Sequence, residues 1–163
     1  MSHVTERGGF VFFWNGWPSQ WYPAVFTVDG TTYSCAEQFM MAEKARLFGD
    51  EATLKLILAA QHPAEQKALG RTVTPFDEAR WTAVCREIVY RGNVAKFEQN
   101  DDLRELLLAT ENKTLVEASP KDRIWGIGLA ADDRRATNRS AWRGKNWLGE
   151  VLMRVRDELR ARG

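Results

Sequence analysis

The order of hydrophobic and polar residues predicts two kinds of secondary structure along this chain. Residues 10–14 and 23–33 are rich in aromatic and β-branched residues, which favours short strands, and Asp29-Gly30 supplies a hairpin turn. From Ser34 onward, apolar residues recur every three to four positions, as on the buried face of a helix. This period predicts helices at about 36–48, 50–60, 63–69, 74–100, 101–109 and 145–159, with a further strand at 114–116. The expected fold is mainly α, multihelical, with a small N-terminal β element.

The start of the first helix and the loop before the last helix each carry a recognisable pattern. Ser34 and Glu37 have the spacing of a capping box, in which the serine caps the helix and the glutamate reaches back to it. Residues 119–144 are mostly loop, and four arginines gather in their second half: Arg134, Arg135, Arg139 and Arg143. These arginines are either a solvated loop or a surface that faces phosphate, because the guanidinium fork matches phosphate geometry.

Length and composition are those of one globular domain. The chain has 163 residues, of which 44% are hydrophobic and 28% charged, so we expect a single domain over residues 1–163 with a core of about 10–162. A formal net charge of +1 argues against a general nucleic-acid coat or a membrane-surface binder. No apolar run is long enough to span a membrane, and residues 1–9 lack the apolar region of a signal peptide. We therefore expect a cytoplasmic protein.

Metal and cofactor chemistry find little support in the sequence. The two cysteines, Cys35 and Cys85, are too few for a disulfide framework or a paired-cysteine metal site, and the two histidines, His3 and His62, stand alone. We expect no metal and no cofactor. Cys35, beside the first helix, is either a reactive thiol or a buried structural one.

Seven tryptophans exceed the usual share for a chain of this length. Only Trp81 lies within a strong helical pattern. The others lie in the N-terminal segment or near the end of the chain, and all but Trp147 are outside the predicted helices: Trp14, Trp17, Trp21, Trp125, Trp142 and Trp147. Such residues either pack in the core or form a surface on which a base or sugar can stack.

Glu37 and Lys44 are the residues of the first predicted helix that could do chemistry. They are seven residues apart, so two turns return them to nearly the same face, with Cα atoms about 10 Å apart. A lysine beside an apolar wall can lose its proton near neutrality and attack an aldehyde or imine carbon. The structural alternatives are that Glu37 completes the capping box and that Lys44 is a surface residue.

Four blocks of sequence, in this order and spacing, make the chain similar to the NADAR superfamily, also called YbiA-like proteins. The resemblance covers about residues 12–159. The blocks are Phe12-Phe13 with Ser19-Gln20-Trp21-Tyr22; Val28-Asp29-Gly30 with Ala36-Glu37-Gln38-Phe39-Met40-Met41-Ala42-Glu43-Lys44; Lys96-Phe97-Glu98-Gln99-Asn100 with residues 103–110; and residues 122–128 with 144–153. The chain departs from the family pattern at Gln20, which replaces an Asn, at Gln38, where His is common, and at Ile127, where riboflavin-type members have Asp.

This resemblance implies a mainly helical enzyme that hydrolyses the bond between ribose C1 and nitrogen. One branch of the family acts on ribosylamine phosphate intermediates of riboflavin synthesis, and another removes ADP-ribose from guanine bases. It further places Glu37 at the chemistry and implies that Lys44 forms a Schiff base with the opened ribose. We expect Glu37 to act as acid and base. The residues expected to bind substrate are Ser19, Gln20, Trp21, Asp122, Trp125, Gly126, Lys145 and Asn146. If the family's Asp at position 127 binds the riboflavin intermediate, Ile127 counts against that substrate.

The expected function is therefore removal of ADP-ribose from ADP-ribosylated guanine in DNA or RNA, and hydrolysis of the ribosylamine phosphate is the alternative. Direct attack by a water that Glu37 activates is the alternative to the Schiff base. Two other classes stay open. One is a module that binds ADP-ribose or a nucleotide without cleaving it, and the other is an interaction domain without a small-molecule ligand. The expected partners are ADP-ribose or a ribosyl phosphate and ADP-ribosylated nucleic acid, with no membrane and no metal.

Overall fold

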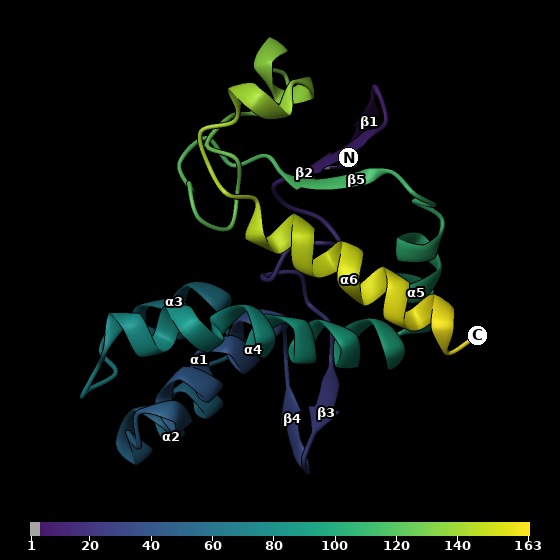
Figure 1. Cartoon of the computed structure of the whole chain (residues 1–163). Helices are drawn as coiled ribbons and strands as arrows, with labels where there is room; N and C mark the ends of the chain where they lie inside the picture. The colour runs from purple at the N-terminus through teal and green to yellow at the C-terminus, as the bar shows by residue number, and fades with distance from the viewer. Residues whose placement is uncertain (1–3) are drawn as a thin grey trace. The chain divides into compact units, whose positions relative to one another are not determined.

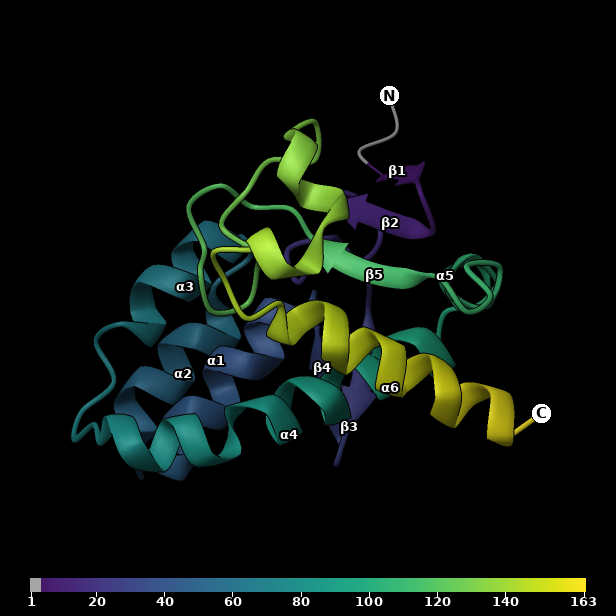
Figure 2. The ribbon, with the colours of Figure 1, turned by 45° about the horizontal axis from the view of Figure 1, so that its top comes forward.

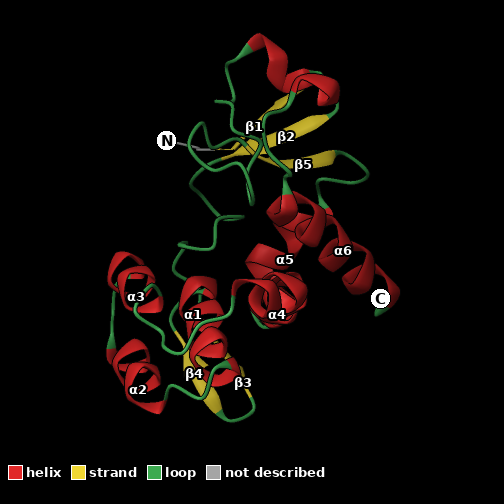
Figure 3. Cartoon of the chain, turned by 60° about the vertical axis from the view of Figure 1, so that its left-hand side comes forward, coloured by secondary structure: helices red, strands yellow, loops and turns green. Residues whose placement is uncertain are grey.

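The computed structural model of the chain describes residues 4–163, so His3 lies outside the described residues. Contacts between residues divide the chain into two compact units, one made of residues 4–22 with 101–163 and the other of residues 23–100. Within residues 4–163 there are six α-helices and five β-strands (Figure 1). Helix predominates over strand (Figure 3), which confirms the expected mainly α fold.

Residues 23–100 form a hairpin followed by four helices. Strands β3 (Phe26–Val28) and β4 (Thr31–Tyr33) pair antiparallel across Asp29 and Gly30, whose φ angles of 50° and 81° suit a tight turn. The helices are α1 (Ala36–Leu47), α2 (Glu51–Ala59), α3 (Pro63–Gly70) and α4 (Glu78–Glu98). Helix α1 packs against each of the other three (Figure 2). It is therefore the central helix of this unit.

Helix α1 is buried over most of its length. Phe39 anchors it to the hairpin, with its ring centroid 5.2 Å from that of Tyr33 and 6.0 Å from that of Phe26. The buried residues of the helix are Ala36, Glu37, Gln38, Phe39, Met40, Met41, Ala42 and Ala45. Two of these side chains are polar, although a buried polar group is stable only with a partner. Glu37 and Gln38 therefore need a structural or chemical explanation.

The other unit combines a three-stranded sheet with two helices. Its strands are β1 (Val4–Arg7), β2 (Phe10–Phe13) and β5 (Thr114–Glu117), in the order β1-β2-β5. Strand β2 pairs antiparallel with β1 and parallel with β5, so that Phe12 lies opposite Val116. Helix α6 (Trp147–Ala161) packs on β5 and also contacts α5 (Asp101–Leu108), as Figure 1 shows. The β element is thus completed by a strand from the second half of the chain.

The hairpin, the six helices and the strand at 114–117 confirm the expected elements. The loop predicted at 119–144 contains two short 3-10 helices, η1 (Arg134–Thr137) and η2 (Arg139–Ala141). Strand β1 was not predicted, because three of its four residues are exposed and it lacks alternating apolar positions. Its signal was the Gly8-Gly9 pair, which has the φ angles of 60° and 82° that a tight hairpin turn requires.

The capping box between Ser34 and Glu37 is not what caps α1, which corrects that interpretation. The residue before the helix is Cys35, which has an extended backbone with φ of −166°. Gln38 has the role expected of Glu37, because its Oε1 accepts the backbone N–H of Ser34 at 2.7 Å. Its Nε2 donates to the carbonyls of Ile57 and Ala60 at 3.0 and 3.2 Å. The helix begins one residue later than the box requires, so Gln38 rather than Glu37 occupies its third position.

All seven tryptophans lie within residues 4–163, and none of them is in the buried core. Trp14 and Trp21 are 50% and 43% exposed, and the others are partly buried. Core packing explains Trp142, which lies against a buried hydrophobic cluster, but not the exposed rings of Trp14 and Trp21. Those two indoles lie at the surface, where a base or sugar can stack.

Candidate active site

Glu37 lies in the first turn of α1 and is only 7% exposed. The helix cap does not explain it, because Gln38 makes those contacts. The N-terminal end of a helix favours a negative charge through the aligned peptide dipoles. A buried carboxylate close to a lysine with a perturbed pKa is a candidate for acid or base chemistry. The structure therefore removes the capping interpretation of Glu37, and its chemical role stays a prediction.

Lys44 lies two turns further along α1 and is half-buried under two aromatic rings. Its Nζ is 4.8 Å from the ring centroid of Phe76 and 5.6 Å from that of Trp81. These contacts hold the amine in place by cation–π attraction. Lys44 is thus not a freely solvated surface lysine.

The segment that carries Phe76 is fixed to the start of α2 by Asp50. One carboxylate oxygen of Asp50 accepts the N–H of Thr53 at 3.0 Å, and the other accepts the N–H of Thr74 at 3.0 Å. Hydrogen bonds from Thr53 and Thr74 lower the pKa of Asp50. The N-cap of α2 therefore also positions the ring that covers the Lys44 amine.

Burial lowers the pKa of the Lys44 ammonium, which is the direction that a lysine nucleophile needs. The negative charge of Glu37 opposes this effect and raises the pKa, whereas the positive charge of Arg71 lowers it further. Glu37 and Lys44 are thus electrostatically coupled along one helix, as their seven-residue spacing predicts. The structure brings these two sequence-predicted residues together within residues 23–100.

Replacing Arg71 with glutamine is expected to move the pH dependence of turnover to higher pH. The neutral fraction of Lys44 rises as pH increases through its pKa, and loss of the Arg71 charge raises that pKa. Turnover at neutral pH should fall about threefold to tenfold and recover at higher pH. The measurement is kcat against pH for wild type, Arg71→Gln and Lys55→Gln, in which an exposed lysine of α2 is changed as the charge-matched control. Coincident profiles for all three would argue against turnover by neutral Lys44.

Lys96 is a second unusual lysine, to which the sequence pattern assigned no role. It lies on α4, is 0% exposed, and its Nζ is 4.9 Å from the ring centroid of Phe97. Burial lowers the pKa of Lys96 to about 7, and its electrostatic interaction with Cys35 acts in the opposite direction. The sequence feature that could have pointed to Lys96 is its place, at helical spacing, in the buried face of α4. This face comprises Cys85, Ile88, Val89, Gly92, Asn93, Lys96 and Phe97. Lys96 is therefore a second amine that can be neutral near neutral pH.

Cys35 precedes Glu37 and is 2% exposed. Its Sγ donates a hydrogen bond to Oε1 of Gln66 at 3.2 Å, and Gln66 Nε2 donates to the carbonyl of Ala60 at 3.0 Å. Burial raises the pKa of the Cys35 thiol, which keeps it protonated. These properties match the structural interpretation of this cysteine rather than the reactive one.

In the other unit, residues 123–128 and 143–148 lie side by side. Their backbones are joined by hydrogen bonds, among them Arg143 N to Ile127 O at 2.8 Å and Lys145 N to Arg123 O at 3.0 Å. A Cβ on Gly144 would lie 2.2 Å from the carbonyl oxygen of Gly126, so only glycine fits there. The two segments therefore form one tightly packed scaffold.

Asp122 and Trp125 lie at the start of this scaffold. Oδ1 of Asp122 accepts the backbone N–H of Ile124 at 2.9 Å and of Trp125 at 2.8 Å. The indole of Trp125 meets that of Trp147 edge to face, with centroids 5.7 Å apart. Asp122 thus orients the loop that presents Trp125, and contact between these residues and a substrate stays a prediction.

Asn146 is buried and serves strand β5. Its Nδ2 donates to the carbonyl of Leu115 at 3.0 Å, and its Oδ1 accepts the N–H of Glu117 at 3.0 Å. Its φ of 56° is left-handed, which ends the loop and begins α6. Its neighbour Lys145 is exposed, with Nζ 5.0 Å from the ring centroid of Trp147. Asn146 therefore positions Lys145 and Trp147. Direct contact of Lys145 and Asn146 with substrate stays a prediction.

Ser19, Gln20 and Trp21 belong to the segment that follows β2. The Ser19 hydroxyl accepts the N–H of Trp21 at 3.1 Å, and the Ser19 carbonyl accepts the N–H of Tyr22 at 3.2 Å. Trp21 and Tyr22 are exposed, at 43% and 36%. Ser19 thus shapes a turn that displays two aromatic side chains.

Ile127 lies in the hydrophobic core rather than at a surface where it could contact substrate. It is 0% exposed and packs in a core cluster with Phe12, Val116, Ala118, Leu129 and Ala136. A side chain at this depth does not reach a ligand at the surface of the scaffold. Its identity therefore says little about substrate choice in this protein.

The sequence-predicted residues thus divide between the two units. Glu37 and Lys44 lie together on α1 in residues 23–100, whereas all eight residues expected to bind substrate lie in residues 4–22 and 101–163. Residues 4–163 contain no group of three or more His, Cys, Asp and Glu side chains that could hold a metal ion. No helix within the same range has the length and apolar character needed to cross a membrane.

The unit of residues 23–100 carries an acid and a lysine on one buried helix, and the other unit carries a scaffold of aromatic and basic residues; both belong to a mainly helical fold. A model of the NADAR domain matches residues 12–160. The chain therefore belongs to the NADAR domain family.

Known relatives agree with this assignment. N-glycosidase R617 of Acanthamoeba polyphaga mimivirus is 47% identical over 145 residues, which are 86% of this chain and 85% of the relative. N-glycosidase Npun_R5314 of Nostoc punctiforme is 34% identical over 155 residues, 92% of each chain. The NMR structure of the Escherichia coli protein YbiA matches with a TM-score of 0.79 and 28% identity, over 98% of this chain and 90% of that one.

Proposed function

We propose that this protein removes ADP-ribose from ADP-ribosylated guanine bases of nucleic acid, with Glu37 as acid and base and Lys44 as the nucleophile. Membership of the NADAR family and relatives named N-glycosidases make the chain a hydrolase of N-glycosyl bonds. The observation that carries the proposed chemistry is the coupled pair on α1. Burial lowers the pKa of Lys44, and the carboxylate that acts on it is itself buried.

The proposed reaction begins with ring opening of an amine-linked ribose, which gives an imine at C1. The neutral amine of Lys44 adds to C1 and forms a new C–N bond. Glu37 delivers a proton to the leaving nitrogen, the bond from C1 to that nitrogen breaks, and a protonated Schiff base to Lys44 remains. Water then adds to C1 while Glu37 takes its proton, and the intermediate collapses to free Lys44 and the aldehyde form of the sugar. The balance is one water consumed for one amine and one free sugar.

This route requires a leaving nitrogen that carries a hydrogen, because only such a nitrogen gives a neutral imine on ring opening. The exocyclic amine of guanine meets this requirement, as does a ribosylamine phosphate. The exposed aromatic side chains of residues 14–22 support the nucleic-acid substrate, since an indole face accepts any unpaired base. Burial of Ile127 removes the argument that its side chain excludes the ribosylamine phosphate, so this smaller substrate is the second candidate.

A paired turnover assay tests the proposed substrate. Wild-type protein receives DNA with ADP-ribosylated guanine in one reaction and the riboflavin-pathway ribosylamine phosphate in the other. The proposal predicts release of free ADP-ribose from the DNA at the higher kcat/KM. Preference for the ribosylamine phosphate would replace the proposed substrate with the second candidate. Binding of ADP-ribose without turnover of either substrate would contradict an enzymatic role and favour the binding module.

A further inference from the structure

Three exposed basic residues belong to the scaffold that presents Trp125. Arg123 and Arg143 flank Gly128, since a Cβ at Gly128 would lie 3.2 Å from Cγ of Arg123 and 3.0 Å from Cβ of Arg143. Lys145 is tied to Arg123 by a backbone hydrogen bond of 3.0 Å. Hydrogen bonds of the backbone, rather than a flexible loop, therefore hold the three residues near one another.

The positive charge of this group is not neutralised by direct pairing. Within residues 4–163, Arg123, Arg143 and Lys145 take part in no ion pair. Asp133 lies within electrostatic range of Arg143, but both of its carboxylate oxygens accept bonds from the Arg135 guanidinium, at 3.0 and 2.7 Å. Two further carboxylates lie by the loop. Asp122 Oδ1 accepts two backbone N–H groups, and Glu117 Oε2 lies 2.8 Å from where a Cβ of Gly126 would be.

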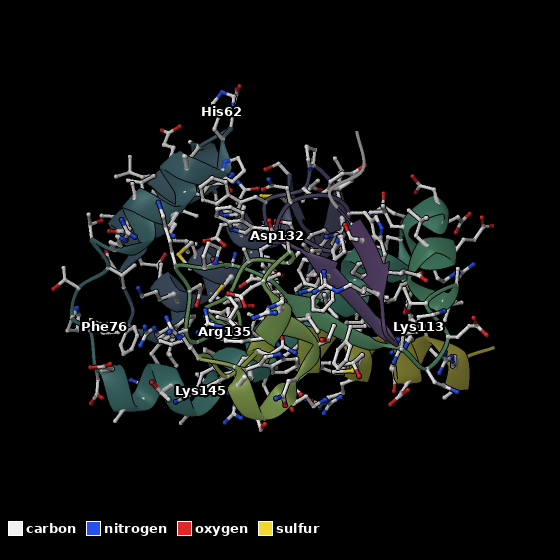
Figure 4. All side chains as sticks on the ribbon, turned by 90° about the horizontal axis from the view of Figure 1, so that it is seen from above. His62, Phe76, Lys113, Asp132, Arg135 and Lys145 are labelled. Atoms are coloured by element: carbon white, nitrogen blue, oxygen red, sulfur yellow. The ribbon has the colours of Figure 1, made fainter. Side chains whose placement is uncertain are left out.

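The structure separates the four arginines that the sequence grouped together. Arg135 is paired with Asp133. Arg139 donates to the Thr114 hydroxyl at 2.7 Å and lies over the ring of Trp142, with Cζ 5.8 Å from its centroid. Only Arg143 of the four is tied by its backbone to the loop that carries Trp125. Figure 4 labels Arg135 and Lys145, which come from η1 and from the segment before α6.

We infer that Arg123, Arg143 and Lys145 form a phosphate-binding site for a nucleotide. The edge-to-face pair of Trp125 and Trp147, with the Lys145 amine over the latter ring, lies beside the cations. A nucleotide presents the same combination of an anionic phosphate and a flat base. Two guanidinium forks and one ammonium suit adjacent phosphoryl groups, because each fork can make two parallel hydrogen bonds. The purpose of the site rests on the proposed function, whereas its affinity for phosphate does not.

The phosphate could be the pyrophosphate of ADP-ribose or the backbone of a nucleic-acid strand, and three probes distinguish these sources. Inorganic pyrophosphate, ADP-ribose and a single-stranded oligothymidylate of about ten nucleotides are titrated into the full chain by calorimetry or fluorescence anisotropy. The variants are Arg123→Gln, Arg143→Gln, Lys145→Gln and the triple variant. Arg134→Gln is the matched control, because it removes one exposed charge from the same loop.

Each single substitution should raise Kd for pyrophosphate about threefold to tenfold, and the triple variant should raise it at least about 30-fold. Arg134→Gln should keep the wild-type Kd. An equal increase in the Kd for ADP-ribose would identify the pyrophosphate of ADP-ribose as the phosphate that the site binds. An increase in Kd for pyrophosphate and the oligonucleotide but not for ADP-ribose, with a smaller salt dependence of oligonucleotide binding, would identify the backbone of a nucleic-acid strand as that phosphate. Equal Kd values for the triple variant and wild type would overturn the inference, even if turnover is normal. Loss of turnover in Glu37→Gln with intact pyrophosphate binding would leave it standing.

Discussion

Replacing Glu37 with glutamine is expected to lower turnover by about two to four orders of magnitude while the protein stays folded. The substitution keeps the shape of the side chain but removes the proton that the leaving nitrogen must receive. The cap of α1 does not depend on Glu37, because Gln38 holds Ser34 and the end of α2. The measurement is kcat on the ADP-ribosylated substrate together with the free energy of unfolding in urea.

Two variants of the same helix serve as controls for Glu37→Gln. Gln38→Ala should lower the free energy of unfolding by about 1–3 kcal/mol, because it leaves the polar groups that Gln38 binds without a partner. Glu43→Gln removes an ion pair with Arg91, at 3.0 Å, and should leave kcat unchanged. Normal kcat in Glu37→Gln, with a loss of stability like that of Gln38→Ala, would return Glu37 to a structural role.

Replacing Lys44 with methionine should abolish turnover and change the free energy of unfolding by less than about 1 kcal/mol. Methionine keeps the apolar stem under Phe76 and Trp81 but cannot form a bond to C1. Only the cation–π contacts are lost, and these are weak at a half-exposed site. Steady-state kinetics and urea unfolding measure the two effects, with Lys55→Met as the control for loss of an exposed lysine.

Substantial turnover by Lys44→Met would exclude this lysine as the nucleophile. Two explanations would then be separable. Loss of turnover in Lys96→Met, with its fold intact, would assign the chemistry to the buried lysine of α4, whose pKa is about 7. Turnover by both variants would favour direct attack by a water that Glu37 activates.

Local patterns predicted most of the fold. The hairpin turn at Asp29-Gly30 depends on turn chemistry within a few residues, and the six helices depend on the local period of apolar positions; the structure has both. Parallel pairing of β2 with β5 joins segments about a hundred residues apart along the chain. Neither strand's own sequence specifies its partner, so this pairing could not be predicted.

The candidate site could likewise be predicted only in part, because some of its features depend on contacts between distant segments. The spacing of Glu37 and Lys44 on one face follows from helical geometry alone, and the charge of Glu37 acts on the pKa of Lys44, whereas their role in catalysis stays a prediction. The capping box was wrong because helix boundaries shift by a residue with tertiary contacts, here the bonds of Gln38 to the end of α2. The burial of Lys96 depends on how α4 packs, although its place in an apolar stripe was visible in the sequence.

The separation of the arginines and the burial of Ile127 were beyond the sequence altogether. Arg135 and Arg143 are equally basic and close along the chain, yet Asp133 pairs with only the first. Ile127 lies between two glycines of a motif, and only the packing shows that it belongs to the core. Both facts depend on contacts between segments rather than on local composition.

Borohydride trapping during turnover tests whether Lys44 forms a covalent bond with the sugar. Wild-type protein is mixed with DNA that carries ADP-ribosylated guanine, reduced with borohydride, digested and mapped by mass spectrometry, with Lys44→Met treated in parallel. We expect a reduced sugar adduct on the peptide that contains Lys44 and none on the variant. Efficient turnover with no adduct, or with the adduct on Lys96, would contradict the assignment of Lys44 as the nucleophile.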